Sequence, residues 1–190
     1  MNKGQTAEDA VDVYSEPDHE CLYDNRHVYA YRVRIAPGQQ TLWHRHTEDT
    51  IYFSLASGRG HEELIDVPTK VTELPCGGIF SRLHKNQPLV HRVSNVGERD
   101  FNLIGAEARA SAATSPPNLP LNAILETARF VVYEISSFFE LTNGERVTGL
   151  LVSTVNQKSP ALNVGESRWL QDSAAVGLAR GFQGFLAVWR

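Results

Sequence analysis

The sequence predicts an all-β protein, built as an antiparallel sandwich or barrel of short strands. Apolar and polar residues alternate along several short segments, which is the period of half-buried strands. Turns rich in Gly and Pro separate these segments at close, regular spacing, as in sandwiches and barrels. The chain has 190 residues, 42% hydrophobic and 21% charged, which is enough for one domain or two small ones.

The first 20 residues differ from the rest of the chain. They carry six acidic side chains and few large apolar ones, so we expect residues 1–20 to form a mobile or loosely docked arm. This start is acidic where a secretory signal would be basic and then apolar. No apolar run approaches the roughly 20 residues that cross a bilayer. We therefore expect a cytoplasmic protein without a membrane partner.

A β-barrel is predicted over residues 21–108. Its first strand places Tyr29, Tyr31, Val33 and Ile35 on one face, and core packing accounts for the two tyrosines. Further strands are expected at 41–46, 51–55, 79–83, 90–94 and 101–107. The polar segment 62–73, interrupted by Pro68, is expected to connect strands rather than form one.

The remainder reads as a linker followed by a second, smaller β unit. Residues 109–124 are rich in Ala, Ser and Pro, and a short helix is expected at 121–127. Four strand-like segments follow within 125–190, and they match parts of the first half in spacing. All seven histidines lie in the first half, and Gly177 aligns with His91. Either the chain is a duplication whose second copy lost a polar site, or similar β patterns coincide by chance.

Two histidines one residue apart predict a metal site. His44 and His46 point to the same face of a strand, because side chains alternate along it. His91, at the start of another expected strand, is the best candidate for a third ligand. Three neutral imidazoles suit zinc, iron, copper or nickel and leave coordination positions free. The alternative is an ordinary pair of surface or core histidines.

Two motifs around these histidines resemble those of the cupin superfamily. Gly38, then five residues, then His44-Arg45-His46 and an apolar strand ending at Gly58 is similar to the first cupin motif, G-x5-H-x-H-x(3,4)-E-x6-G. The stretch from Pro88 to Asn95, which contains His91, is similar to the second, P-x-G-x2-H-x3-N. The resemblance covers about residues 27–108. It implies a jelly-roll barrel, with a partial second cupin-like unit after it.

The chain departs from the cupin pattern at two places. The family's glutamate ligand would fall at Thr50 or Ile51, and the second motif lacks its glycine. Losing the carboxylate resembles the three-histidine cupins, which include iron-dependent dioxygenases. Three neutral ligands would leave a divalent ion its full charge, so such a site should attract a small anionic, chelating substrate. Glu48 or Asp49 remains an alternative fourth ligand from the turn.

The function expected from this resemblance is a non-haem Fe(II) dioxygenase. The alternatives are a lyase, isomerase or hydrolase that uses zinc, nickel or manganese, with copper a further candidate metal, and a non-catalytic small-molecule-binding cupin. His84 is a candidate acid/base. Arg82, which shares a strand face with it, is a candidate clamp for a substrate carboxylate.

The net charge and the resemblance also suggest which partners to expect. The formal net charge of −4 and a pI near 6.0 argue against a nucleic-acid partner. Cupins commonly pair through sheet edges, so a homodimer is expected by analogy.

Overall fold

The computed structural model divides the chain into two compact units, residues 1–109 and 110–190. Each unit is an assembly of strands, and short 3₁₀ turns occur at Ala7–Asp9 and Val13–Ser15. The residues that the structure describes are 6–111, 119–136, 146–154, 165–173 and 182–190.

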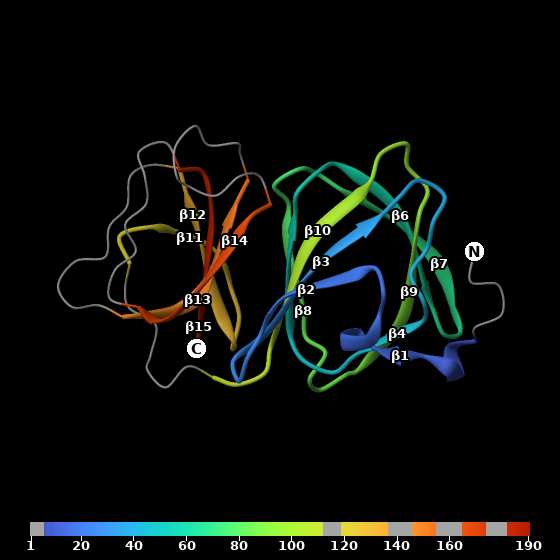
Figure 1. Cartoon of the computed structure of the whole chain (residues 1–190), viewed down its shortest axis with the longest axis horizontal. Coiled ribbons are helices and arrows are strands. Elements are labelled where there is room, and N and C mark those ends of the chain that lie inside the picture. Colours follow the sequence, from blue (N-terminus) through green and yellow to red (C-terminus); the bar gives the residue numbers. More distant parts are fainter. Residues whose placement is uncertain (1–5, 112–118, 137–145, 155–164, 174–181) are drawn as a thin grey trace. The chain divides into compact units, whose positions relative to one another are not determined.

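The first unit contains two five-stranded sheets (Figure 1). The first, which we name sheet I, is antiparallel and consists, in spatial order, of β2 (His19–Asp24), β3 (Val28–Ile35), β10 (Phe101–Ala108), β5 (Thr50–Ser54) and β8 (Ile79–Arg82). The second, sheet II, consists of β1 (Val11–Asp12), β4 (His44–His46), β9 (Leu89–Asn95), β6 (Gly58–Leu64) and β7 (Val67–Leu74). Its pairs are antiparallel except the parallel pair of β1 and β4.

The chain winds back and forth between the two sheets. It enters sheet I at β2 and β3, crosses to sheet II at β4, and returns to sheet I at β5, β8 and β10, with β6, β7 and β9 in sheet II between these returns. This winding is that of a jelly roll, so the predicted fold class is confirmed. A core cluster from both sheets fills part of the interior: Val13, Tyr29, Tyr31, Val33, Ile35, Tyr52, Leu74, Phe101 and Leu103.

The N-terminal segment is docked rather than loose from residue 6 onward, which corrects the expected arm. β1 pairs with β4, and the amide of Val11 donates to the carbonyl of Trp43. Val13 is buried in the core. The buried carboxylate of Glu16 accepts hydrogen bonds from the amides of Asp18 and Leu42. Burial of these few groups outweighs the acidic composition that suggested disorder.

The polar segment expected to connect strands is instead the hairpin of β6 and β7. Its turn places Asp66 at a φ of 57°, a conformation that Asp tolerates. Pro68 is accommodated because β7 is an edge strand, where a missing N–H donor breaks no interior ladder. The sequence does not show the alternation expected of a strand here, because the charged residue Glu62 faces the interior, where an apolar residue is expected.

The second unit contains one antiparallel sheet. Its strands, in spatial order, are β11 (Asn122–Glu126), β12 (Phe130–Ile135), β15 (Gly184–Trp189), β13 (Val147–Ser153) and β14 (Ser167–Ser173). The helix expected at 121–127 is therefore wrong, because pairing with β12 outweighs the local helix propensity.

The sheet of the second unit has the same strand order as sheet I. In both sheets the order along the sheet is first, second, fifth, third and fourth strand of that sheet in the sequence. This order is what the duplication hypothesis predicts. The aligned position Gly177 lies outside the described residues.

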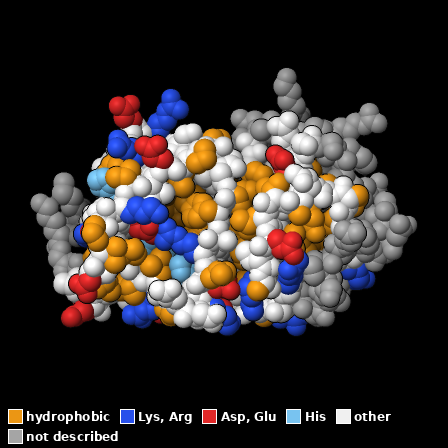
Figure 2. Space-filling view, turned by 180° about the vertical axis from the view of Figure 1, so that it is seen from behind, with side chains coloured by type: hydrophobic (Ala, Val, Ile, Leu, Met, Phe, Trp, Pro, Cys, Tyr) orange, Lys and Arg blue, Asp and Glu red, His pale blue; other side chains and the backbone are white. Residues whose placement is uncertain are grey.

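The surface carries both signs of charge. Acidic and basic side chains lie beside one another on the face shown in Figure 2. Within the part of the chain that the structure describes, no helix has the length and apolar character needed to span a bilayer.

Candidate functional site

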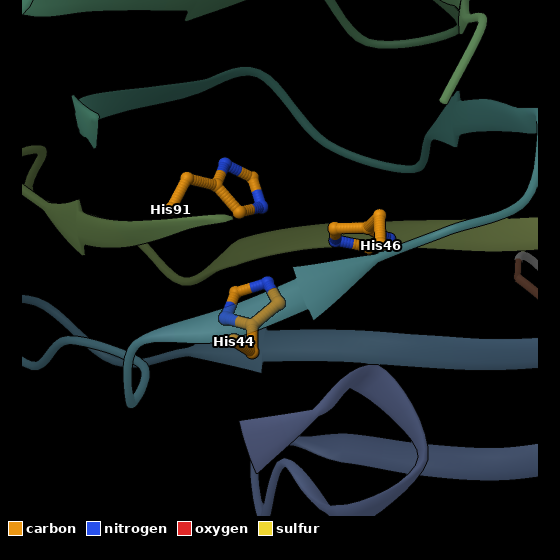
Figure 3. Close-up of side chains that lie close together, drawn as sticks. All are labelled: His44, His46 and His91. Carbon is orange, nitrogen blue, oxygen red and sulfur yellow. The ribbon is translucent and has the colours of Figure 1, made fainter. Parts of the chain in front are cut away.

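Three histidines meet in the interior of the first unit. His44 and His46 are each 1% exposed and lie on β4, with the exposed Arg45 between them. His91 of β9 lies directly opposite His44 in the strand register. One nitrogen of each ring lies within 4.8 Å of the other two, and Figure 3 shows the rings converging from the two strands. The sequence-predicted trio is therefore brought together.

The hydrogen bonds of the three rings fix which nitrogen is available to a ligand. Nδ1 of His44 lies 2.9 Å from the carbonyl oxygen of Leu42, and Nδ1 of His46 lies 2.8 Å from Oε1 of Glu107. Nδ1 of His91 lies 2.8 Å from Oε1 of Glu62. The carbonyl of Leu42 and the carboxylate of Glu62 accept, so Nδ1 of His44 and of His91 carries the proton and Nε2 keeps its lone pair. His46 takes the same tautomer where Oε1 of Glu107 is the accepting oxygen of that carboxyl group. Rings in this tautomer have the donor atoms of a metal site.

Burial keeps these imidazoles neutral. It is the main cause that lowers the pKa of His44 and His46 well below the usual value, and neighbouring imidazoles lower it further. The pKa of His91 is also lowered by burial, although Glu62 opposes that effect. Neutral imidazole is the form that binds metal ions, so no proton has to leave at neutral pH.

One buried nitrogen atom indicates that the three histidines fit a metal ion. Nε2 of His91 is buried and has no hydrogen-bond partner among the described residues. A buried polar atom without a partner is costly, and an ion between the three rings would satisfy it. His44, His46 and His91 would hold that ion.

A partly buried ion pair supports His91. Both guanidinium amino groups of Arg82 donate to the carboxylate of Glu62, one of them at 2.8 Å to Oε2. These bonds and His91 lower the pKa of Glu62, against the effect of burial. Arg82 lines the cavity rather than lying wholly on the outer surface, but its charge is already paired with Glu62. It acts on the site through Glu62 and His91.

A second carboxyl group supports His46. Glu107 of β10 is fully buried and accepts from His46 at one oxygen and from the hydroxyl of Tyr14 at the other, at 3.2 Å. Burial raises the pKa of Glu107 to about 8, although the Tyr14 hydroxyl opposes this. The pattern reading missed Glu107 and Glu62. For Glu107 the sequence does offer a signal, because this acidic residue occurs at the spacing of two shared by the apolar residues on one face of its strand.

Two further histidines lie against the three. The ring of His84 stacks on His46 with centroids 5.2 Å apart, and its Nε2 has no partner among the described residues. His19, expected in the mobile arm, is buried in β2, with its ring 4.8 Å from that of His44. Burial lowers the pKa of His84 to about 4 and that of His19 to about 3. Five imidazoles thus share one interior.

The carboxylates considered as a fourth ligand have other partners. Glu48 accepts from the ammonium group of Lys85 at 3.0 Å, and Asp49 accepts from the backbone amide of the same residue. Neither belongs to the three-histidine group. Thr50, near the place of the family's glutamate, is buried and bonds through its hydroxyl to the carbonyl of Glu48.

A cavity borders the three histidines. It offers about 60 Å³ to the centres of water molecules, enough for roughly four to six waters at about 10–15 Å³ each. Its polar lining includes His19, Tyr31, Tyr52 and Arg82, and much of the rest is aliphatic or aromatic. The strand winding and the three-histidine group around this cavity agree with the fold and the ligand set that the two motifs implied.

The first unit has a cupin-like jelly-roll fold. No protein-family model and no curated protein matches the chain. Among solved structures, a cupin domain from Bordetella pertussis is 25% identical over 48% of this chain and 92% of its own, with a TM-score of 0.45. An RmlC-like cupin with a double-stranded β-helix fold from Methanocaldococcus jannaschii is 16% identical over 47% of this chain and 77% of its own, with a TM-score of 0.40.

Proposed function

We propose that the cupin barrel is a metal-dependent enzyme, a non-haem Fe(II) dioxygenase that acts on a small anionic, chelating substrate. The observation that supports it most is the tautomer of the three histidines, which directs three neutral Nε2 atoms to one point. Zinc, nickel, manganese and copper are the alternative ions, since imidazole suits them as well. The cytoplasmic location and the homodimer inferred from sequence belong to this proposal.

The charges around the site favour an anion. The ligands are neutral, and the nearby carboxylate of Glu62 is compensated by Arg82. A bound divalent ion would therefore keep most of its charge, and Fe(II) would bring dioxygen together with the substrate, which supplies the electrons. Glu62 and Glu107 hold the rings in orientation, and the apolar lining limits water around the substrate.

His84 favours a second candidate function, a metal-dependent lyase, isomerase or hydrolase. Its buried Nε2 lacks a partner among the described residues, and its ring lies against His46. In that reaction His84 would move a proton to or from the substrate, and a His84→Gln variant would lose turnover while keeping its metal.

Metal analysis tests the proposed centre. Protein purified without chelator should contain close to one divalent ion per chain, and His44→Ala, His46→Ala and His91→Ala should each lose it. His61→Ala is the matched control, because His61 lies on β6 outside the three-histidine group. Metal content unchanged in all three ligand variants would refute the centre.

Oxygen consumption then separates the two reactions. The iron-loaded protein is screened against carboxylates, thiols and diketones in an oxygen electrode. Substrate-dependent uptake that His91→Ala abolishes supports the dioxygenase. Turnover of a substrate without oxygen uptake supports the second candidate instead.

A further inference from the structure

Two tyrosines flank a glycine in one row of sheet I. Tyr31 of β3 and Tyr52 of β5 both lie directly opposite Gly105 of β10. A Cβ atom at Gly105 would lie 2.5 Å from Cζ and 2.6 Å from the hydroxyl oxygen of Tyr31. The phenol of Tyr31 therefore lies over the glycine, in the space between the two outer strands.

The hydroxyl groups of this pair are available to a ligand. Tyr31 is 0% and Tyr52 6% exposed, and neither hydroxyl oxygen has a hydrogen-bond partner that meets normal geometry among the described residues. The two groups are near enough for each to influence the other's pKa. Even if one donates to the other, at least one O–H remains to donate elsewhere. Both residues line the cavity.

Other rings hold the pair in place beside the metal ligands. Tyr31 stacks on His19, with centroids 4.5 Å apart and planes at 15°, and Tyr52 stacks on Phe80, at 4.8 Å and 16°. Both phenol rings lie 6.4 Å from the ring of His46. The hydroxyls thus belong to a rigid wall next to the histidines, which is the support that a binding group needs.

The cavity limits what this wall can bind. Space for about four to six waters admits a ligand with about as many non-hydrogen atoms. Val33, Leu103 and Phe101 line it as well, which suits a short alkyl portion. The guanidinium of Arg82 is paired with Glu62, so the neutral donors of the lining are the two phenols and the hydroxyls of Thr41 and Thr72. The two phenol rings are the ones that lie next to the ring of His46.

We propose that Tyr31 and Tyr52 form a paired donor site that binds an oxygen of a short-chain carboxylate beside the three-histidine centre. This rests on the proposed function in one respect, since the metal ion supplies the charge that draws the anion. Tyr31 and Tyr52 position the ligand through one of its oxygens. The small cavity favours short acids over long ones.

Calorimetric titration of the zinc-loaded protein with acetate, butyrate and octanoate tests the site. Acetate and butyrate should bind and octanoate should not. Tyr31→Phe and Tyr52→Phe should each weaken butyrate binding about tenfold, the effect expected for one hydrogen bond to a charged group. Tyr29→Phe is the matched control, because Tyr29 lies two residues away on the same strand but outside the cavity lining. Zinc titration of each variant should match that of the original protein.

The outcomes separate the donor site from the metal centre. If zinc binds and either phenylalanine variant binds butyrate as well as the original protein does, the paired site is overturned and the metal centre stands. If zinc does not bind, the metal centre fails. The pair is then tested in metal-free protein with dimethyl sulfoxide, a neutral oxygen acceptor, followed by NMR. Equal affinity in the original protein and in both variants there, or no binding at all, overturns the pair as well.

Discussion

Replacing Glu62 by Gln should weaken metal binding without touching any ligand. In the native protein one carboxylate oxygen accepts from His91 and from Arg82, and the other accepts from Arg82 alone. An amide has one accepting oxygen and one donating NH₂ group. If its oxygen faces His91, the NH₂ group opposes a guanidinium donor. If it is turned around, the NH₂ group opposes Nδ1–H of His91 and drives the ring toward the tautomer that cannot bind through Nε2.

Either orientation removes one favourable contact and adds one repulsive contact in a buried place. Loss of such an orienting partner typically lowers metal affinity 10- to 100-fold. That range corresponds to about 1.4–2.7 kcal/mol. We expect Glu62→Gln to fall within it and to keep the three imidazoles near their native positions, because the strand register of His44 and His91 is unchanged.

Glu63→Gln provides the matched control. Glu63 is the next residue on β6 and also pairs with an arginine, Arg92, at 2.5 Å, but its side chain is 28% exposed against 6% for Glu62, and it lies outside the cavity lining. Because the hydrogen bonds of Glu63 go to Arg92 rather than to a histidine, the metal affinity of this variant should equal that of the original protein. The assay is competition for Zn(II) or Co(II) against a chromophoric chelator. An affinity for Glu62→Gln within threefold of the control would refute the orienting role.

Two further substitutions test the architecture around the site. Gly105→Ala should lower the free energy of unfolding, measured by chemical denaturation, by about 1–3 kcal/mol, because the new Cβ overlaps the Tyr31 ring. A stability equal to that of the original protein would show that the ring moves freely. Asn95→Ala should lower the free energy of unfolding by about 2–4 kcal/mol, because the buried side-chain amide donates to the carbonyls of Ile35 and Arg99 and accepts from the backbone amide of Gly97. A loss under about 0.5 kcal/mol, as expected for an exposed asparagine, would contradict this prediction.

Two of the three candidate metal ligands could be predicted from sequence because their geometry is local. The period of two on a strand places His44 and His46 on one face, whatever the rest of the fold does. His91 required the resemblance to a known motif, since no local rule sets it opposite His44 in the register. The second-motif asparagine, Asn95, is likewise placed correctly by the motif, and the structure shows why an amide is needed there.

The groups that support the ligands could not be predicted, because they depend on register between strands distant in sequence. Glu107 reaches His46 across 61 residues of sequence, and Glu62 reaches His91 across 29. The alternation within its own strand predicts that Tyr31 packs in the core. Its phenol lies over Gly105 of the neighbouring strand, and that neighbour cannot be predicted from the pattern of one strand. His19 falls in the expected loose arm because residues 1–20 are acidic and carry few large apolar side chains.

The two units illustrate how the interior of a β-structure can be filled in two ways. In the first unit, sheet II supplies the three candidate ligands, and sheet I supplies the tyrosine pair and Glu107. The second unit repeats the strand order of sheet I, but its core cluster is almost wholly aliphatic and aromatic, with Leu151, Leu186 and Phe182 among its members.

Burying apolar side chains stabilises a sheet directly, whereas burying imidazoles and carboxyls does so only when each one has a partner. Residues 109–190 contain no histidine, so this unit lacks the imidazole ligands of the first. If the second unit is a duplicate that has no site to maintain, we expect apolar side chains to have replaced the polar ones in its interior. The demand for fully partnered polar groups then explains why the first unit keeps Glu62, Arg82 and Glu107 beside its histidines.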